Sequence, residues 1–196
     1  MKIKILVFAD LHGGLNALLD KYTLETPDLI FILGDLCDAE AKKIDAMFKD
    51  IPKLGIHGNH DTETVFEQTQ ITDIFGVFAE SDEFSVTAMQ GSSRYKPSQY
   101  YGYTQDESIE ACKKLRKASI FLSHDGPYDK NKDDAHCGLQ GIDLYIKNNQ
   151  PDIFMYGHHH KNQHYQIGNT DCYCVYEIAL FTIENNKVID VKNFNL

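Results

Sequence analysis

Five short apolar runs of this chain each end in a turn that carries aspartate, histidine or asparagine. Continuous apolar runs of this kind are typical of strands that are buried on both faces of a parallel sheet. Because the carboxyl ends of parallel strands lie at one edge of a sheet, we expect the five turns to meet at one rim, where ligands bind in such folds. The turns cover residues 10–13, 34–38, 58–61, 123–127 and 157–160.

The segments around these runs predict an α/β (α+β) chain in which strands and helices alternate. Expected strands cover residues 4–9, 29–33, 53–57, 84–89, 119–123, 153–156, 172–180 and 187–191. Expected helices cover residues 15–24, 39–49, 62–70, 105–117 and 139–148. Residues 91–103 hold glycine, serine, proline and four tyrosines, which predicts a long loop. The length of 196 residues predicts a single domain over residues 1–196.

The chain is acidic, since 19 lysines and arginines stand against 29 aspartates and glutamates, for a net charge of −10. This disfavours a protein that grips extended nucleic acid through a broad basic face. No apolar run reaches the roughly 18 residues of a membrane span, and the first run is too short for a signal peptide. Five cysteines, an odd number, favour a reduced cytoplasmic protein, with Cys172 and Cys174 as small apolar strand residues.

The residue types in the five turns predict metal chemistry. Neutral imidazole and ionised carboxylate both bind divalent transition metals. A carboxylate can also bridge two ions, so the turns are compatible with a two-metal hydrolytic site. In such a site the ions lower the pKa of a water, and the resulting hydroxide attacks phosphorus while the ions neutralise charge on the phosphoryl oxygens.

The order of the turns carries a resemblance to a known family. Along the chain they read D-x-H, G-D-x-x-D, G-N-H-D, a lone histidine after a strand, and G-H-x-H. The chain thus resembles the calcineurin-like metallophosphoesterase family, from residue 3 to about residue 180. The resemblance implies a four-layer α/β/β/α sandwich, in which two mixed β-sheets are flanked by helices.

The resemblance also implies a role for each motif residue. The first metal ion would be held by Asp10, His12 and His160, and the second by Asn59, His124 and His158. Asp35 would bridge the two ions. His60 would protonate the leaving oxygen as general acid, with Asp61 as its orienting partner. Two divalent ions are the expected cofactors, with Mn²⁺ foremost and iron, zinc or nickel as alternatives.

Two departures narrow the expected substrate. Ala39 and Asp61 stand where phosphoprotein phosphatases of the superfamily carry arginine and glutamate. Residues 91–95, 123–128 and 136–138 resemble the smaller phosphodiesterase-like branch of the family instead. We therefore expect a small phosphodiester or phosphomonoester as substrate, nucleotides included.

Several residues near the motifs have two interpretations. Arg94 could contact a substrate phosphate, since arginine suits bidentate phosphate contact, and His136 could lie near the site or flank a helix start. Asp38 could cap the next helix or support a ligand. The tyrosines of residues 91–103 could stack on a nucleobase or pack on one another. No role at the site is expected for His57, His159 and His164.

Two other functions stay open at this point. A non-catalytic metal-binding scaffold of the same fold is disfavoured because every ligand position and His60 are filled. A metal-dependent nuclease is disfavoured by the net charge of −10. We expect no membrane partner, and the sequence leaves the formation of a homo-oligomer open.

Overall fold

Alternate side chains of β1 (Lys2–Ala9) enter two different hydrophobic cores. Ile5 and Val7 face the core between two sheets, whereas Leu6 and Phe8 face the core beneath two helices. All four side chains are fully buried. Because successive strand residues point to opposite faces, burial on both sides produces the continuous apolar run of the sequence.

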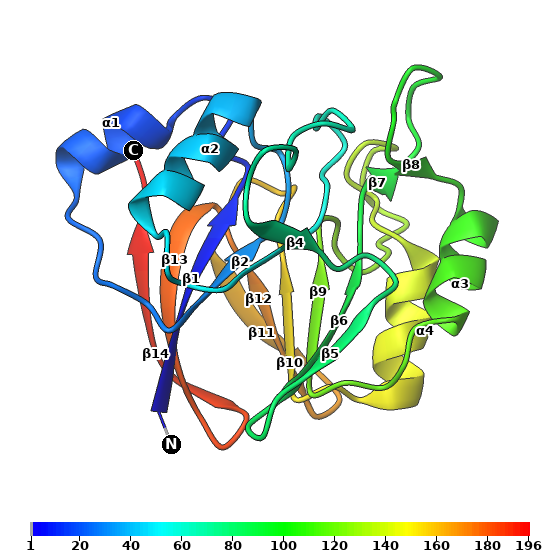
Figure 1. Ribbon diagram of the computed structural model, residues 1–196. Helices are drawn as coiled ribbons and strands as arrows, with labels where there is room; N and C mark the ends of the chain where they lie inside the picture. Colours follow the sequence, from blue (N-terminus) through cyan, green and yellow to red (C-terminus); the bar gives the residue numbers. More distant parts are fainter. Residues whose placement is uncertain (1) are drawn as a thin grey trace.

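The computed structural model describes residues 2–196 and contains two mixed six-stranded sheets packed face to face (Figure 1). The first sheet has the order β14 (Lys187–Phe194), β13 (Glu177–Glu184), β1, β2 (Leu29–Ile32), β3 (Lys53–Gly55), β4 (Ile71–Asp73). The second sheet has the order β11 (Gln163–Ile167), β12 (Thr170–Cys174), β10 (Ile153–Tyr156), β9 (Ile120–Ser123), β6 (Ser85–Met89), β5 (Phe78–Glu80). The central strands of both sheets are parallel, and antiparallel strands lie toward the edges.

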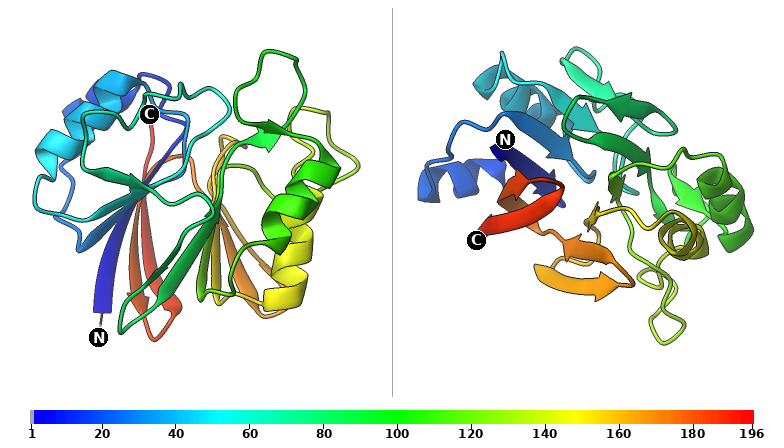
Figure 2. Two further views of the ribbon diagram at one scale, coloured as in Figure 1. Left: turned by 45° about the vertical axis from the view of Figure 1, so that its right-hand side comes forward. Right: turned by 90° about the horizontal axis from the view of Figure 1, so that it is seen from below.

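Helices cover the outer face of each sheet (Figure 2). Helices α1 (Leu15–Lys21) and α2 (Asp38–Met47) share a core with the first sheet, and α3 (Gln105–Lys113) and α4 (Gln140–Asn149) share one with the second. The third core lies between the sheets. The expected four-layer α/β/β/α sandwich is therefore confirmed.

The helix expected over residues 62–70 is wrong. The segment forms successive turns, in which the backbone N–H groups of Val65, Glu67 and Thr69 each bond to the carbonyl three residues earlier. Gln68 has a φ of 59°, which a right-handed helix does not allow. The helices expected over residues 15–24 and 105–117 end earlier, at Lys21 and Lys113.

Strand boundaries differ most where strands are short or change sheet. The expected loop over residues 91–103 contains the paired strands β7 (Ser92–Ser93) and β8 (Gly102–Tyr103). The pattern over residues 172–180 divides into β12 and β13, which belong to different sheets. Strands β4, β5 and β11 were not expected, and all three are edge strands. Cys172 and Cys174 are buried in β12, as expected.

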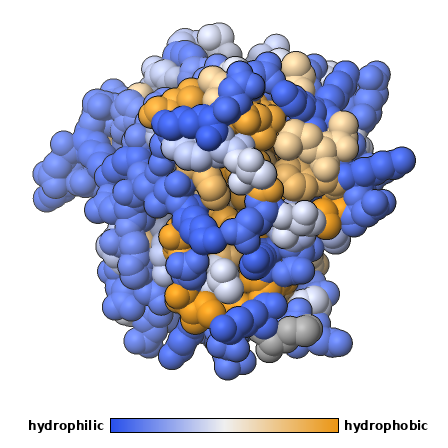
Figure 3. All heavy atoms as spheres, turned by 90° about the vertical axis from the view of Figure 1, so that its left-hand side faces the viewer, coloured by the Kyte–Doolittle hydropathy of each residue, from blue (hydrophilic) through white to orange (hydrophobic). Residues whose placement is uncertain are grey.

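The face that carries α1 and α2 is mainly hydrophilic, with small apolar patches (Figure 3). Within the described residues, no helix combines the length and the apolar character needed to cross a membrane.

Candidate metal centre

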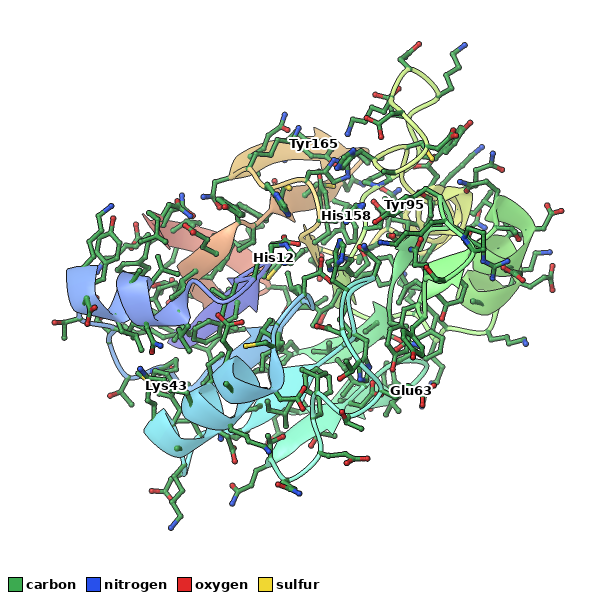
Figure 4. All side chains as sticks on the ribbon, turned by 90° about the horizontal axis from the view of Figure 1, so that it is seen from above. His12, Lys43, Glu63, Tyr95, His158 and Tyr165 are labelled. Atoms are coloured by element: carbon green, nitrogen blue, oxygen red, sulfur yellow. The ribbon has the colours of Figure 1, made fainter. Side chains whose placement is uncertain are left out.

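The turns that follow β1, β2, β3, β9 and β10 meet at one rim of the two sheets, which Figure 4 shows from above. There they bring together the residues that the sequence analysis proposed as metal ligands. Five of these have a left-handed backbone, an uncommon conformation for side chains other than glycine: Asp10, His12, Asp35, His158 and His160. Such backbone strain clusters at functional sites, where the surrounding structure maintains it.

One group of potential ligands comprises Asp10, His12 and His160, whose ligand atoms all lie within 4.8 Å of one another. The Nε2 atoms of His12 and His160 are 3.2 Å apart, and His160 Nε2 is 3.8 Å from Asp10 Oδ1. Two ligands of one tetrahedral transition-metal ion lie about 3.4 Å apart, so these separations suit a shared ion.

A second group comprises Asp35, His124 and His158, again with ligand atoms within 4.8 Å of one another. His124 Nε2 lies 3.5 Å from Asp35 Oδ2 and 2.9 Å from Asn59 Oδ1. Asp35 Oδ2 is also 3.8 Å from His12 Nε2 of the first group. The Asp35 carboxylate therefore lies between the two groups.

Hydrogen bonds fix the tautomers of two of these histidines. His124 Nδ1 lies 2.7 Å from the Leu33 carbonyl, and His158 Nε2 lies 2.6 Å from the Ala135 carbonyl. Because a carbonyl only accepts, each of these nitrogens carries the proton, and the other ring nitrogen keeps its lone pair. Burial lowers the pKa of His124 to about 4, so its imidazole is neutral at pH 7.

With this tautomer of His124, two hydrogen-bond acceptors face each other. The lone pair of His124 Nε2 faces Asn59 Oδ1 at 2.9 Å, with no proton to share between them. The two carboxylates also have unsatisfied acceptors. One oxygen of each is satisfied, since Asp10 Oδ2 accepts the His158 backbone N–H and Asp35 Oδ1 accepts that of His60. Their other oxygens, Asp10 Oδ1 and Asp35 Oδ2, are buried and have no hydrogen-bond partner among residues 2–196. A cation would satisfy all of these atoms.

The charges of the buried carboxylates also favour bound cations. Burial raises the pKa of Asp10 well above its usual range, and the charge of Asp35 raises it further. Burial and the charge of Asp35 also raise the pKa of Asp61 to about 7. Several buried carboxylates thus repel one another, and divalent cations would relieve that repulsion. The residues present fit two such ions.

Comparison with known proteins gives a family for this arrangement. The family model of the calcineurin-like phosphoesterases matches residues 3–162. The chain belongs to the calcineurin-like phosphoesterase family. It is therefore a phosphoric ester hydrolase, and membership of the family implies divalent metal ions. No curated protein matches the chain in a sequence search.

Solved structures with low sequence identity share the fold of this phosphoesterase. TT1561 of Thermus thermophilus is 16% identical with a TM-score of 0.66, and the match covers 100% of both chains. The phosphopantetheinyl hydrolase PptH of Mycobacterium tuberculosis is 11% identical with a TM-score of 0.62, and the match covers 89% of each chain. A novel archaeal phosphodiesterase is 14% identical with a TM-score of 0.57, and the match covers 97% of this chain and 99% of that one.

His60 lies at the edge of the centre of this phosphoesterase. Its ring centroid is 5.6 Å from that of His12, and its side chain is exposed. Together with His12, Asp35 and the start of α2, it lines a cavity of about 440 Å³. Burial lowers the pKa of His60, and the charge of Asp35 opposes this effect. A lower pKa makes the protonated imidazole a stronger acid.

Within residues 2–196 the Asp61 carboxylate makes no hydrogen bond to the His60 side chain, for which the resemblance implied an orienting contact. The Asp61 carboxylate accepts the backbone N–H groups of Asp35, Leu36 and Gly58 at 3.0, 2.8 and 2.6 Å. These bonds join the turn after β2 to the turn after β3. In the part of the chain that the structure describes, these backbone donors have no other hydrogen-bond partner, and the buried Asp61 carboxylate satisfies them.

Arg94 does not reach into the centre. Its guanidinium donates to the Gly102 carbonyl from Nε and from Nη2, at 3.1 and 2.7 Å, and lies 2.9 Å from Glu107. Its donors therefore hold the base of the loop between β7 and β8. His136 is closer, since its ring centroid is 5.3 Å from that of His158, while its Nδ1 lies 2.9 Å from Asp133.

Two features of the centre were missed from the sequence. The side chain of His159, for which no role was expected, is 5% exposed, and its Nε2 lies 3.4 Å from Oδ1 of the fully buried Asp125. The hydroxyl of Tyr95 accepts a hydrogen bond from Asn59 Nδ2 at 3.3 Å. The sequence held a weak signal for each: His159 stands between two proposed ligands, and Tyr95 is one of the tyrosines of residues 91–103 that were considered for stacking on a nucleobase. Asp38, which had two interpretations, begins α2 and accepts a long 3.4 Å bond from Thr62.

Proposed function

We propose that this phosphoesterase hydrolyses a small phosphodiester or phosphomonoester at a dinuclear centre. Asp10, His12 and His160 would hold one divalent ion, and His124, His158 and Asn59 the other. Asp35 would be shared. The observation that carries the proposal is the position of the Asp35 carboxylate, with Oδ2 3.8 Å from His12 Nε2 and 3.5 Å from His124 Nε2.

The bound ions, for which Mn²⁺ is our first choice, would supply Lewis acidity and an activated water. The residues of the chain have separate tasks. The carbonyls of Leu33 and Ala135 hold the protons of His124 and His158 away from the centre, so each ring offers a lone pair. Asp61 fixes the two turns that carry Asp35 and Asn59.

His60 would act as the general acid. It is exposed at the wall of the 440 Å³ cavity, so it can reach a leaving group there without crossing the ligands. Protonated at pH values near or below its pKa, it would donate its ring proton to the ester oxygen as the P–O bond breaks. The leaving alcohol would then depart through the same cavity.

The experiment is hydrolysis of bis-p-nitrophenyl phosphate and of p-nitrophenyl phosphate by protein that has been chelated and reloaded with Mn²⁺. We expect turnover of at least one ester between pH 6 and 9, and loss of that turnover in Asp35→Asn. Faster hydrolysis of the diester would identify a phosphodiesterase, and faster hydrolysis of the monoester a phosphatase of small metabolites. Wild-type protein that binds Mn²⁺ and hydrolyses neither ester would contradict the proposal.

A further inference from the structure

The four tyrosines of residues 91–103 have different environments. Tyr101 stacks on His57 at a centroid distance of 4.5 Å, and the Tyr103 hydroxyl accepts a bond from Gln90. Tyr100 is 71% exposed. Tyr95 alone of the four is directed at a proposed metal ligand, because its hydroxyl lies 3.3 Å from Asn59 Nδ2. Figure 4 shows Tyr95 at the same rim as His158.

The loop that carries Tyr95 is fixed at its base. Arg94 bonds twice to the Gly102 carbonyl, as described above. Gln99 is buried and donates to Ser92 Oγ at 2.8 Å and to the Ser93 carbonyl at 3.1 Å. Its Oε1 accepts the Tyr95 backbone N–H at 3.3 Å. These bonds place the Tyr95 side chain before any ligand arrives, which reduces the entropic cost of using it.

The hydrogen bond to Asn59 leaves the Tyr95 proton available. An amide Nδ2 can only donate, so in this pair the Tyr95 hydroxyl is the acceptor. Within residues 2–196 the hydroxyl makes no other hydrogen bond. The Lys96 ammonium lies 5.1 Å from the centroid of the Tyr95 ring, so the ring also has a positive charge beside it. The hydroxyl therefore offers an unused donor at the edge of the proposed metal centre.

We propose that the Tyr95 hydroxyl donates a hydrogen bond to a non-bridging phosphoryl oxygen of the substrate. The inference rests on the proposed function, because it requires the phosphoryl group to occupy the centre beside Asn59. Bonds from a hydroxyl to a charged oxygen are short and strong, and this bond strengthens as negative charge gathers on phosphorus. Tyr95 would then make the contact with the substrate phosphate that the sequence had suggested for Arg94.

The test compares Tyr95→Phe with Tyr100→Phe, a matched change in an exposed residue of the same loop. In Mn²⁺-reloaded protein we expect kcat/KM of the better p-nitrophenyl ester to fall roughly 10- to 100-fold in Tyr95→Phe, as for loss of one bond to a charged group. Tyr100→Phe should stay within about twofold of wild type. Equal kinetics in Tyr95→Phe and wild type would overturn the inference.

A binding measurement separates this inference from the proposed function. Calorimetric titration of the Mn²⁺-loaded proteins with inorganic phosphate should give a weaker affinity for Tyr95→Phe and an unchanged one for Tyr100→Phe. Mn²⁺ affinity should be the same in all three proteins. If Tyr95→Phe loses Mn²⁺ affinity, the residue acts through Asn59, and the inference is wrong. If wild type hydrolyses no ester but Tyr95→Phe still weakens phosphate binding, the proposed function is wrong. The contact between the Tyr95 hydroxyl and a phosphoryl oxygen is then still supported.

Discussion

His159 Nε2 lies 3.4 Å from Asp125 Oδ1, and the two side chains are 5% and 0% exposed. Each follows a proposed ligand in the chain, since His159 comes after His158 and Asp125 after His124. The carboxylate also accepts the Ser93 backbone N–H at 3.0 Å, at the start of the Tyr95 loop. A Cβ at Gly126 would lie 3.0 Å from His159 Nε2, so glycine leaves room for the pair. The pair thus joins three segments of the centre.

Replacement of His159 should weaken metal binding. Mutation of a group that orients metal ligands typically lowers metal affinity by about 10- to 100-fold. We therefore expect His159→Gln to raise the Kd for Mn²⁺ by roughly 10-fold. Isothermal titration of chelated protein measures it. The control is His164→Gln, an exposed histidine that pairs with Asp171 on β11 and β12. Equal Mn²⁺ affinity in His159→Gln and wild type would show that the pair does not hold the ligands.

Replacement of Asp61 should lower stability. Asp61→Asn keeps one oxygen but turns an amide donor toward backbone N–H groups that now bond to a carboxylate. Losing these hydrogen bonds to buried backbone N–H groups should cost about 2–4 kcal/mol in the free energy of unfolding. Urea unfolding of the metal-free protein measures the difference. A change of less than about 0.5 kcal/mol would contradict the role assigned to Asp61.

Replacement of His60 should make activity depend on the leaving group. An alkoxide needs a proton as it departs, whereas p-nitrophenolate is stable without one. We expect His60→Ala to reduce kcat by roughly 100-fold or more for alkyl esters and by much less for p-nitrophenyl esters. Asp61→Asn makes a useful comparison, because it should affect both kinds of ester equally. A uniform loss in His60→Ala would argue against a general acid.

Asp143 should make the folded chain less stable at neutral pH than at acid pH. Burial raises the pKa of this half-buried carboxyl in α4 from 3.8 to about 6. A raised pKa means that the folded state binds the proton more tightly, so stability falls as pH rises from about 4 through 6. After allowance for solvent screening, we expect Asp143→Asn to add about 1 kcal/mol at pH 7.5 and nothing at pH 4.

Thermal unfolding at the two pH values measures this effect of Asp143→Asn. The control is Asp82→Asn, a change at an exposed residue near the turn between β5 and β6. It should leave the stability unchanged at both pH values. A gain at pH 4 as large as that at pH 7.5 would show that ionisation of Asp143 is not the cause.

That the candidate ligands meet at one rim could be predicted from the sequence, because each of them lies in a turn that follows an apolar strand. Asp10 and His124 come directly after strands, and Asp35 follows the end of β2 by three positions; the carboxyl ends of these strands share a rim, so topology brings the three residues together. The potential ligands lie in two groups with Asp35 between them, and the ligand roles that the family resemblance implied stay a prediction. The alternation of strands and helices followed from the same pattern, whereas the four-layer sandwich was implied by the family resemblance.

Other features depend on contacts that spacing does not encode. The side chain of His159 turns back toward Asp125, 34 positions earlier in the chain, only because β9 and β10 are neighbours. Arg94 and Tyr95 are adjacent, and only the folded loop decides which of them faces the centre. The helix expected over residues 62–70 failed because hydrophobic spacing there competes with a turn at Gln68.

The central claim is that two divalent ions share Asp35. Crystals of the chelated protein, soaked with Mn²⁺ and measured at the manganese absorption edge, test it directly. The account predicts two anomalous peaks, one bounded by Asp10, His12 and His160 and the other by Asn59, His124 and His158, with the Asp35 carboxylate in contact with both. A single peak, or a second peak that Asp35 does not touch, would contradict it.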